Sequence, residues 1–326
     1  MSEVGPGRAG FVDPYGALAC ALAAMLFAAK GIFAKKLYAL GVGVEAVVAI
    51  RAVISLPLFW WFALRRESWQ TIRATPPQAI FMAALAGALC YYVGALLDFA
   101  ALTMIDASIE RVLIFSYPAM VVLFTSVRDR AWPSRRVLAA TALSYLGIFF
   151  TMGGLDFEEL RANLFGALLV IGSALSYAIY FLVSEKYTRS VGSSRFTLLA
   201  MTAATVCLAP HYLIVNGTAD LESIGAEAWL LLLGIAVFCM FLPASLQAEG
   251  VRRIGAQRGA VLSTVGPPTT VVLAWGLLGE RLSAWQWAGM ALIVLGILVL
   301  DLARSSARSA EDRVVNAPAN PPPRRD

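Results

Sequence analysis

The stretch Phe165–Tyr187, FGALLVIGSALSYAIYFLVSEKY, decides the fold class of this chain. Apart from a few serines it carries only apolar, aromatic or small residues until Glu185, close to its end. An α-helix needs roughly 20 mostly apolar residues to cross the hydrocarbon core of a bilayer. The stretch is therefore predicted to form a transmembrane helix.

The whole chain has the composition that such helices require. Of its 326 residues, 59% are hydrophobic and only 14% are charged, whereas soluble domains have about 45–50% apolar and about 25% charged residues. A soluble protein of this size could not hide that excess from water. The composition excludes a disordered protein and a disulfide scaffold. The continuous apolar runs exclude an outer-membrane barrel, whose strands alternate in polarity.

Ten apolar runs follow one another, and we predict an all-α integral membrane protein with ten transmembrane helices. The tail 304–326 is polar and rich in proline, so it is predicted to be disordered and cytoplasmic. Residues 1–13 are predicted to be a cytoplasmic N-terminal segment, and 155–163 an external linker. The predicted spans are residues 14–37, 45–64, 78–103, 107–127, 137–154, 164–186, 195–216, 228–249, 258–279 and 284–303.

The distribution of Lys and Arg sets the predicted orientation. With the N-terminus inside, 19 of the 26 basic residues fall on inside segments, five on outside segments and two within spans. Basic residues are enriched in cytoplasmic loops. We therefore expect a multi-pass protein of a bacterial-type inner (plasma) membrane with both termini in the cytoplasm. The same pattern accounts for the net charge of +5, so no nucleic-acid partner is expected.

The two halves of the chain resemble each other at an offset of 149–150 residues. Because each half holds five spans, an odd number, the second half is predicted to lie upside down relative to the first. Inverted repeats are typical of secondary transporters, which bind substrate near the midplane where the halves meet. The matched pairs are Tyr15–Leu18 with Phe165–Leu168, Lys36 with Lys186, Ala107 with Ala256, Val112 with Val261, Pro118 with Pro267, and Leu146–Ile148 with Leu295–Ile297.

Several segments resemble the EamA repeat of the drug/metabolite transporter superfamily. The second half opens with Gly166–Tyr187 and closes with LLGERLSAWQWAGMALIVLGILVL, Leu277–Leu300. In the first half, Ile50–Ala52 resembles the arginine-containing start of the second span, and Asp106–Pro118 resembles the segment that leads into the fourth. The resemblance implies two inverted five-helix repeats.

The resemblance covers residues 14–154 as the first EamA repeat and 164–303 as the second. One segment departs from the family pattern. Ser126–Arg136, SVRDRAWPSRR, stands where the family has a Gly-Glu-Arg-Leu turn. No role is therefore carried over to this segment.

Five ionisable residues lie inside predicted spans, where a charge costs at least a few kcal/mol. Lys30, Arg51, Asp98, Glu110 and Arg111 come from four spans and lie roughly 5–9 Å below the outer ends of those spans, at about 1.5 Å per residue. In one interpretation Lys30 or Arg51 contacts a substrate carboxylate, while Asp98 holds a substrate amine or carries a proton. In the other interpretation these residues form ion pairs that only join the helices.

The repeat supplies counterparts for two of these charges. The offset takes Lys30 to Tyr180 and Asp98 to Gln247, so the second half offers neutral polar groups. Such an asymmetric site suits a zwitterion or an anion. Aromatic side chains, whose faces hold cations and flat substrates, are the further lining candidates: Tyr91, Tyr92, Phe115, Tyr117, Tyr177, Phe181 and Trp275.

Other residues are candidates for gating or for a charge network. Glu249 lies near the predicted inner face beside Arg252 and Arg253, where it forms either a gate or a solvated helix end. Pro118 and Pro267 are repeat counterparts, and proline kinks of this kind act either as hinges or as static bends. The last candidates are Glu110 and Arg111, which either belong to the same network or lie at the membrane interface.

We expect a secondary transporter that moves a small polar metabolite, amino acid-like or an organic anion, across the inner membrane by alternating access. The resemblance slightly favours export. Energy is expected from the substrate gradient or from protons, and the protein is expected to be a monomer or a homodimer. We expect no enzymatic activity, cofactor or metal, because the chain has one histidine, no HExxH and no P-loop. The alternatives are a lipid-modifying membrane enzyme and a non-transporting assembly or sensor subunit.

Overall fold

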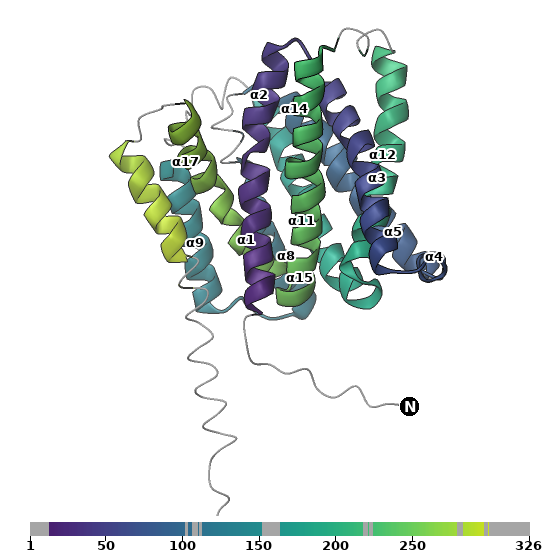
Figure 1. Ribbon diagram of the computed structural model, residues 1–326. Coiled ribbons are helices and arrows are strands. Elements are labelled where there is room, and N and C mark those ends of the chain that lie inside the picture. Colours follow the sequence, from purple (N-terminus) through teal and green to yellow (C-terminus); the bar gives the residue numbers. More distant parts are fainter. Residues whose placement is uncertain are drawn as a thin grey trace, which may run out of the picture.

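The computed structural model describes residues 13–101, 104–105, 110, 113–151, 164–217, 221, 224–278, 283–296 and 299. The secondary structure in these ranges is helical, with no strand among them. The helices stand side by side as an upright bundle (Figure 1). This arrangement confirms the all-helical fold class.

Six helices are long and apolar enough to cross a membrane, and each coincides with a predicted span. The rest of the described chain holds shorter helices at the other predicted spans, so the count of ten spans stays a prediction. The shorter helices are α8 (Tyr117–Asp129), α9 (Arg135–Thr151), α16 (Ala256–Leu262) with α17 (Gly266–Leu278), and a helix at Ala284–Gly296. The six long helices are Pro14–Ala39, Val44–Arg66, Pro77–Ala101, Leu164–Val191, Ser193–Asn216 and Ala226–Ile254.

Three of the six long helices are made of successive segments. The first span breaks at Ala29, between α1 (Pro14–Ala28) and α2 (Lys30–Ala39). The remaining long helices are continuous: α3 (Val44–Arg66), α11 (Leu164–Val191) and α12 (Ser193–Asn216). The other two segmented spans are α5 (Pro77–Gly87), η1 (Ala88–Gly94) and α6 (Ala95–Ala101), and then α14 (Ala226–Ala236), η2 (Val237–Phe241) and α15 (Leu242–Ile254).

The segments η1 and η2 are π-helical, and they occupy the same place in the two halves. They begin at Ala88 and Val237, 149 residues apart, which is the offset of the sequence repeat. π-helical turns inside α-helices are rare and frequently lie at functional sites. A matched pair of them supports the two-repeat arrangement independently of the side chains.

Pro118 and Pro267 also occupy matching places. Each is the second residue of a helix, α8 or α17, and each follows a short non-α stretch. That stretch is a turn at Phe115–Ser116 in the first half and the 3₁₀ helix η3 (Ser263–Val265) in the second. Proline is well tolerated in the first turn of a helix, because its missing N–H would have no partner there. The two prolines therefore begin the second segment of a broken span.

Two close helix crossings connect the halves, and they are equivalent in the repeat. Helix α1 packs along α15 (Figure 1), and a Cβ at Gly16 would lie 2.8 Å from Ile254 Cγ2. Helix α11 packs along η1 and α6, and a Cβ at Gly166 would lie 3.0 Å from Ile105 Cγ2. Small residues let transmembrane helices approach closely. At both crossings a glycine packs against an isoleucine. The two glycines are counterparts in the repeat, and so are the two isoleucines.

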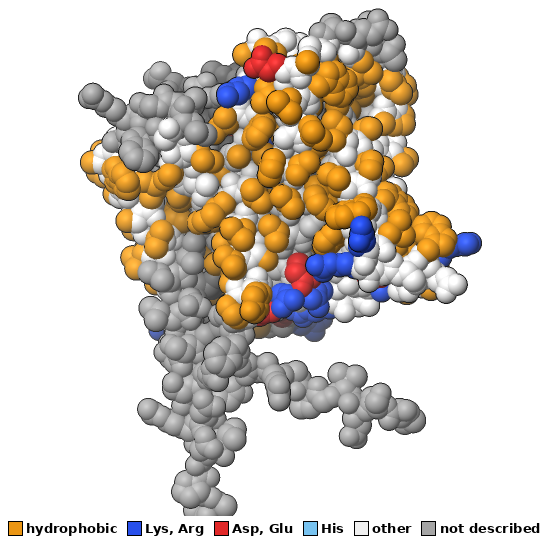
Figure 2. All heavy atoms as spheres, in the orientation of Figure 1, with side chains coloured by type: hydrophobic (Ala, Val, Ile, Leu, Met, Phe, Trp, Pro, Cys, Tyr) orange, Lys and Arg blue, Asp and Glu red, His pale blue; other side chains and the backbone are white. Residues whose placement is uncertain are grey.

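The outer surface of the bundle is apolar over its middle. Figure 2 shows hydrophobic side chains covering the face, with Lys, Arg, Asp and Glu gathered at the lower edge and a few at the upper edge. A soluble protein rarely exposes an apolar area of this kind. Together with the six long apolar helices, this surface identifies a multi-pass membrane protein. Exposed side chains of the surface include Leu18, Leu22, Phe81, Leu168, Leu230 and Leu233.

Candidate functional site

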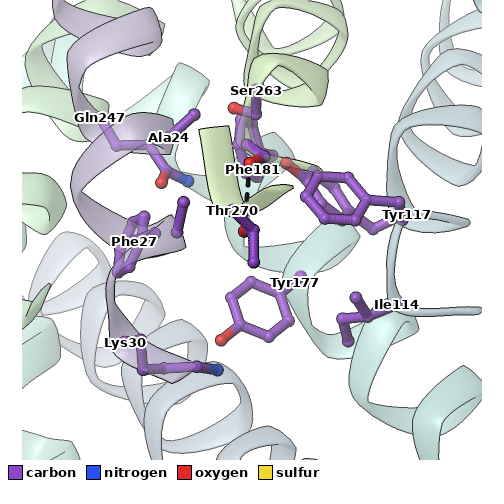
Figure 3. A pocket seen from close by; sticks show the side chains of 13 residues that line it. Ala24, Phe27, Lys30, Ile114, Tyr117, Tyr177, Phe181, Gln247, Ser263 and Thr270 are labelled. Atoms are coloured by element: carbon purple, nitrogen blue, oxygen red, sulfur yellow. Dashed lines mark hydrogen bonds between the residues drawn. The ribbon is translucent and has the colours of Figure 1, made fainter. Parts of the chain in front are cut away.

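A cavity of about 80 Å³ lies between the two halves of the bundle. Lys30, Tyr177 and Gln247, three of the predicted binding residues, line it together (Figure 3). Helices of both repeats contribute to its wall, as expected of a site where the halves meet. The complete lining is Ala24, Phe27, Ala28, Lys30, Ile114, Phe115, Tyr117, Tyr177, Phe181, Gln247, Ser263, Gly266 and Thr270.

The charge in this cavity belongs to Lys30, the first residue after the break in the first span. Its Nζ lies 3.2 Å from Oδ2 of Asp98, which is on α6. The Asp98 side chain is 2% exposed and that of Lys30 is 13% exposed, so the aspartate is enclosed while the lysine also faces the cavity. Burying such a pair carries a desolvation penalty of several kcal/mol per ion. The pair is therefore a weak source of stability.

A second cation lies close to the same aromatic ring as Lys30. The Phe99 ring centroid is 5.3 Å from Lys30 Nζ and 5.4 Å from Arg51 Cζ. Arg51 is buried on α3, and its Nε has no hydrogen-bond partner among the described residues. Cations are attracted to aromatic faces, so Phe99 brings the positive charges of Lys30 and Arg51 to one ring. The sequence analysis did not predict Phe99, because an apolar residue in an apolar run carries no signal.

The aromatic part of the wall comes mostly from predicted residues. The Tyr117 ring centroid lies 5.3 Å from that of Phe181, 5.9 Å from that of Phe115 and 6.0 Å from that of Tyr177. In Figure 3 the Tyr177 hydroxyl and the Lys30 ammonium lie at the same end of the cavity. Seven lining residues were not predicted from the sequence: Ala24, Phe27, Ala28, Ile114, Ser263, Gly266 and Thr270.

Other predicted residues lie elsewhere. Tyr180 is not among the residues that line this cavity, and its ring meets that of Tyr91 edge-on at 5.1 Å. Glu110 is buried, with 1% of its surface exposed. Arg111 and the side chain of Trp275 lie outside the part of the chain that the structure describes.

Glu249 takes part in a charge network at the end of the bundle where α1 begins. Its carboxylate accepts hydrogen bonds from Arg252 Nε at 2.9 Å, from Ser193 Oγ at 2.5 Å and from Arg253 Nε. Nη1 of Arg253 also donates to Asp13 Oδ2 at 2.6 Å. We call Asp13, Ser193, Glu249, Arg252 and Arg253 the α1–α15 network. Glu249 is thus held by partners on two helices, α12 and α15.

Asp13 has two functions in this network. Its Oδ1 accepts the backbone N–H of Tyr15 at 3.0 Å and of Gly16 at 3.4 Å, which caps the start of α1. Its Oδ2 accepts from Arg253 on α15. The hydrogen bond from Arg253 holds the pKa of Asp13 below its ordinary value of 3.8. The network therefore joins the beginning of the first repeat to the second repeat.

Comparison with known proteins agrees with the two-repeat arrangement. Residues 14–153 and 164–301 each match the EamA-like transporter family. The uncharacterized transporter YcbK of Bacillus subtilis (strain 168) is 34% identical over 272 residues, which are 81% of this chain and 85% of that protein.

Two further similarities extend over most of the chain. The uncharacterized inner membrane transporter YedA of Escherichia coli (strain K12) is 22% identical over 290 residues, 86% of this chain and 90% of that protein. One solved crystal structure superposes with a TM-score of 0.75 at 16% identity, covering 89% of this chain and 98% of that chain, which shows a shared fold. The two family matches and the similarity to YcbK confirm the resemblance seen in the sequence: the chain belongs to the EamA-like transporter family.

Proposed function

We propose that this transporter moves a small polar metabolite, amino acid-like or an organic anion, by alternating access through the cavity between the repeats. The observation that carries the proposal is that Lys30 faces the cavity while it is paired with the enclosed Asp98. A substrate carboxylate would compete with Asp98 for the lysine. A substrate ammonium would then approach the carboxylate that this exchange sets free.

The rest of the wall supports the same class of substrate. Gln247 and Tyr177 offer neutral hydrogen-bonding groups, and the aromatic rings offer an apolar surface for the remainder of the molecule. The cavity of about 80 Å³ is smaller than the roughly 300–1,000 Å³ of typical ligand pockets. The halves would therefore separate on one side to admit substrate, as alternating access requires.

In this proposal the α1–α15 network closes the cytoplasmic end of the pathway. This assignment rests on the orientation derived from the basic residues, with both termini inside. Opening that end would separate Asp13 from Arg253. The matched π-helical segments and the turns before Pro118 and Pro267 are the places where the spans would bend. Protonation of Asp98 would weaken its pair with Lys30, which offers one route to proton coupling.

Counterflow into liposomes containing the purified protein tests the proposal, with a panel of labelled amino acids and organic acids. Lys30→Met is expected to lower counterflow at least about tenfold, because a hydrogen bond to a charged group contributes roughly 1.5–3 kcal/mol. Lys36→Met is the matched control, because Lys36 is on the same helix and exposed. Intact transport in both Lys30→Ala and Asp98→Ala would overturn the proposal, and so would turnover of lipid without flux.

A further inference from the structure

A second hollow lies away from the transport cavity, between α8 and α9. Its volume is about 360 Å³, and its wall on α8 runs from Ala119 to Val127, about 12 Å along the helix axis. The wall is mostly apolar and ends at Arg130 and Trp132 in the loop between the two helices. We call this hollow the α8–α9 groove. It shares no lining residue with the transport cavity.

The groove opens toward the surroundings of the bundle rather than into its core. Its side chains Leu123 and Val127 are 59% and 70% exposed, and Trp132 is 94% exposed. Exposed tryptophan is enriched at the level where a membrane meets water. The loop lies at the same end of the bundle as the α1–α15 network, because Arg128 pairs with Glu185 at 3.2 Å and Glu185 lies beside Gly255. The groove is therefore bordered by lipid along its length and by water at its loop end.

The loop end of the groove carries positive charge that the protein does not neutralise. Arg128 pairs with both Asp129 and Glu185. The guanidinium groups of Arg130 and Arg135, in contrast, have no hydrogen bond or ion pair within the described part of the chain. Both side chains are exposed. Arg130 therefore lines the end of the apolar trough, and Arg135 lies two residues beyond Pro133, another lining residue, both without a partner among the described residues.

Arg130 also has an unusual backbone conformation. Arg130 has φ +49, the left-handed region, and is the one non-glycine residue with positive φ in the described ranges. It ends α8 as glycine commonly does, with Ala131 N–H donating to the carbonyl of Ser126 at 3.1 Å. An arginine in this place accepts strain that glycine would avoid. Glycine at this position would lack the guanidinium group that arginine provides.

The same charge is absent from the equivalent segment of the second repeat. Residues 126–136 hold four arginines and one aspartate, whereas residues 275–285 hold one arginine and one glutamate. The basic loop is therefore specific to the first repeat, and the distribution of basic residues places this loop on the cytoplasmic side. It is also the segment where the sequence departs from the family pattern.

We propose that the α8–α9 groove binds an anionic phospholipid. An acyl chain lies along α8, and the phosphodiester headgroup is held by Arg130 and Arg135. The site combines the two features that such a ligand needs, an apolar trough and cations at its water-facing end. Basic pockets between transmembrane helices on the cytoplasmic side bind anionic headgroups in this way. The proposal is independent of which substrate the transporter carries.

Native mass spectrometry of the full chain in neutral detergent tests this site, with phosphatidylglycerol and phosphatidylcholine titrated separately. Phosphatidylglycerol is expected to be retained in preference to phosphatidylcholine and to raise the melting temperature. In Arg130→Gln/Arg135→Gln its affinity is expected to fall about 30-fold, because each basic side chain contributes roughly fivefold at an anionic surface.

Arg65→Gln/Arg66→Gln is the matched control, because it removes two exposed arginines from the end of α3, away from the groove. It is expected to retain phosphatidylglycerol. Soluble glycerophosphoglycerol and inorganic phosphate are expected to have no effect, which separates a lipid site from a free-phosphate site. Equal retention of the two lipids, unchanged affinity in the double variant, or stabilisation by phosphate alone would overturn the proposal. A dimer that persists without lipid and is lost in Leu123→Arg would assign the groove to a second copy, which also overturns it.

Discussion

The crossing of α1 with α15 and the crossing of α11 with α6 are equivalent in the repeat, yet among the described residues charges join the first and not the second. At the first crossing, Glu249 and Arg253 form the α1–α15 network with Asp13. The offset of the repeat places Ala100 and Met104 at the corresponding positions of the second crossing. The duplication thus preserves the backbone approach at both crossings, while the two corresponding positions carry charged side chains at the first crossing and apolar ones at the second.

This difference indicates how an inverted repeat becomes directional. If both crossings were identical, the two ends of the pathway would open with equal ease. An ionic contact present at one end favours the conformation in which that end is closed, and a ligand can shift such an equilibrium only through its differential affinity. The predictions below address first the shared packing and then the charges.

The largest effect is expected where the shared packing itself is disrupted. In Gly250→Val the new side chain would meet Cys20 and the Gly16 carbonyl oxygen, which lies 2.9 Å from a Cβ built at position 250. Overpacking of a close contact typically costs about 1–3 kcal/mol, occasionally more. A fall in melting temperature in detergent would report this loss.

A companion variant tests whether the loss arises at this contact. Cys20→Ala in the Gly250→Val background removes the sulfur atom that the valine meets, so part of the lost stability should return. The second crossing already carries Ala101 at the position that matches Gly250. If Gly250→Val unfolded at the wild-type temperature, the close approach of α1 and α15 would be wrong.

An intermediate effect is expected when the charges of the first crossing are removed. Arg253→Gln breaks the contacts with both Asp13 and Glu249, so the end of the pathway at α1 should open more often. A cysteine introduced at Ser263, a cavity residue, should then react about two- to fivefold faster with a thiol reagent added from that side, because exposed ion pairs contribute roughly 0.2–1 kcal/mol each.

The neighbouring arginine supplies the control for this measurement. Arg252 bonds Glu249 but makes no ion pair with α1 among the described residues. Arg252→Gln should therefore leave the labelling rate near that of the parent protein. Equal rates in the two variants would mean that the link to Asp13 does not hold this end closed.

The smallest effect is expected from pH. Because Arg253 holds the pKa of Asp13 below 3.8, the carboxylate stays ionised at every pH above that ordinary value. The stabilisation from this pair is present above pH 3.8 and is lost as the pH falls through the lowered pKa. The labelling rate at Ser263→Cys, divided by the rate of the same cysteine in the Arg253→Gln background at the same pH, should therefore change less than about twofold between about pH 8 and pH 5, because this ratio cancels the ionisation of the thiol. A steep rise within that range would assign the closure to another titrating group.

Much of the fold was predictable from the sequence, because apolar runs of the required length predict membrane helices. The repeat was visible in the sequence because matched positions of the two halves make equivalent contacts in the structure. Gly16 and Gly166 make equivalent close contacts, so neither tolerates a side chain without a shift of its neighbours. A partner for Asp98 was expected because charge inside a span is costly, but the sequence did not choose between Lys30 and Arg51.

What the sequence did not predict depends on local departures from α-helical geometry. The break at Ala29 was not expected, since alanine is the strongest helix former. Lys30, the first residue after that break, faces the cavity, whereas its counterpart Tyr180, on the continuous α11, does not. Phe99 was missed because its importance comes only from the two cations that approach its ring.

The π-helical segments η1 and η2 determine which way the following residues face. Such a segment inserts about one extra residue into a turn of 3.6, and the insertion rotates everything beyond it by roughly 100° about the helix axis. Asp98 follows η1, and Gln247 follows η2. Without the insertions, the same two spans would have the same apolar length and the same place in the bundle. The carboxylate of Asp98 and the amide of Gln247, however, would turn away from the interior. The polarity of the interior therefore depends on a single added residue in each half.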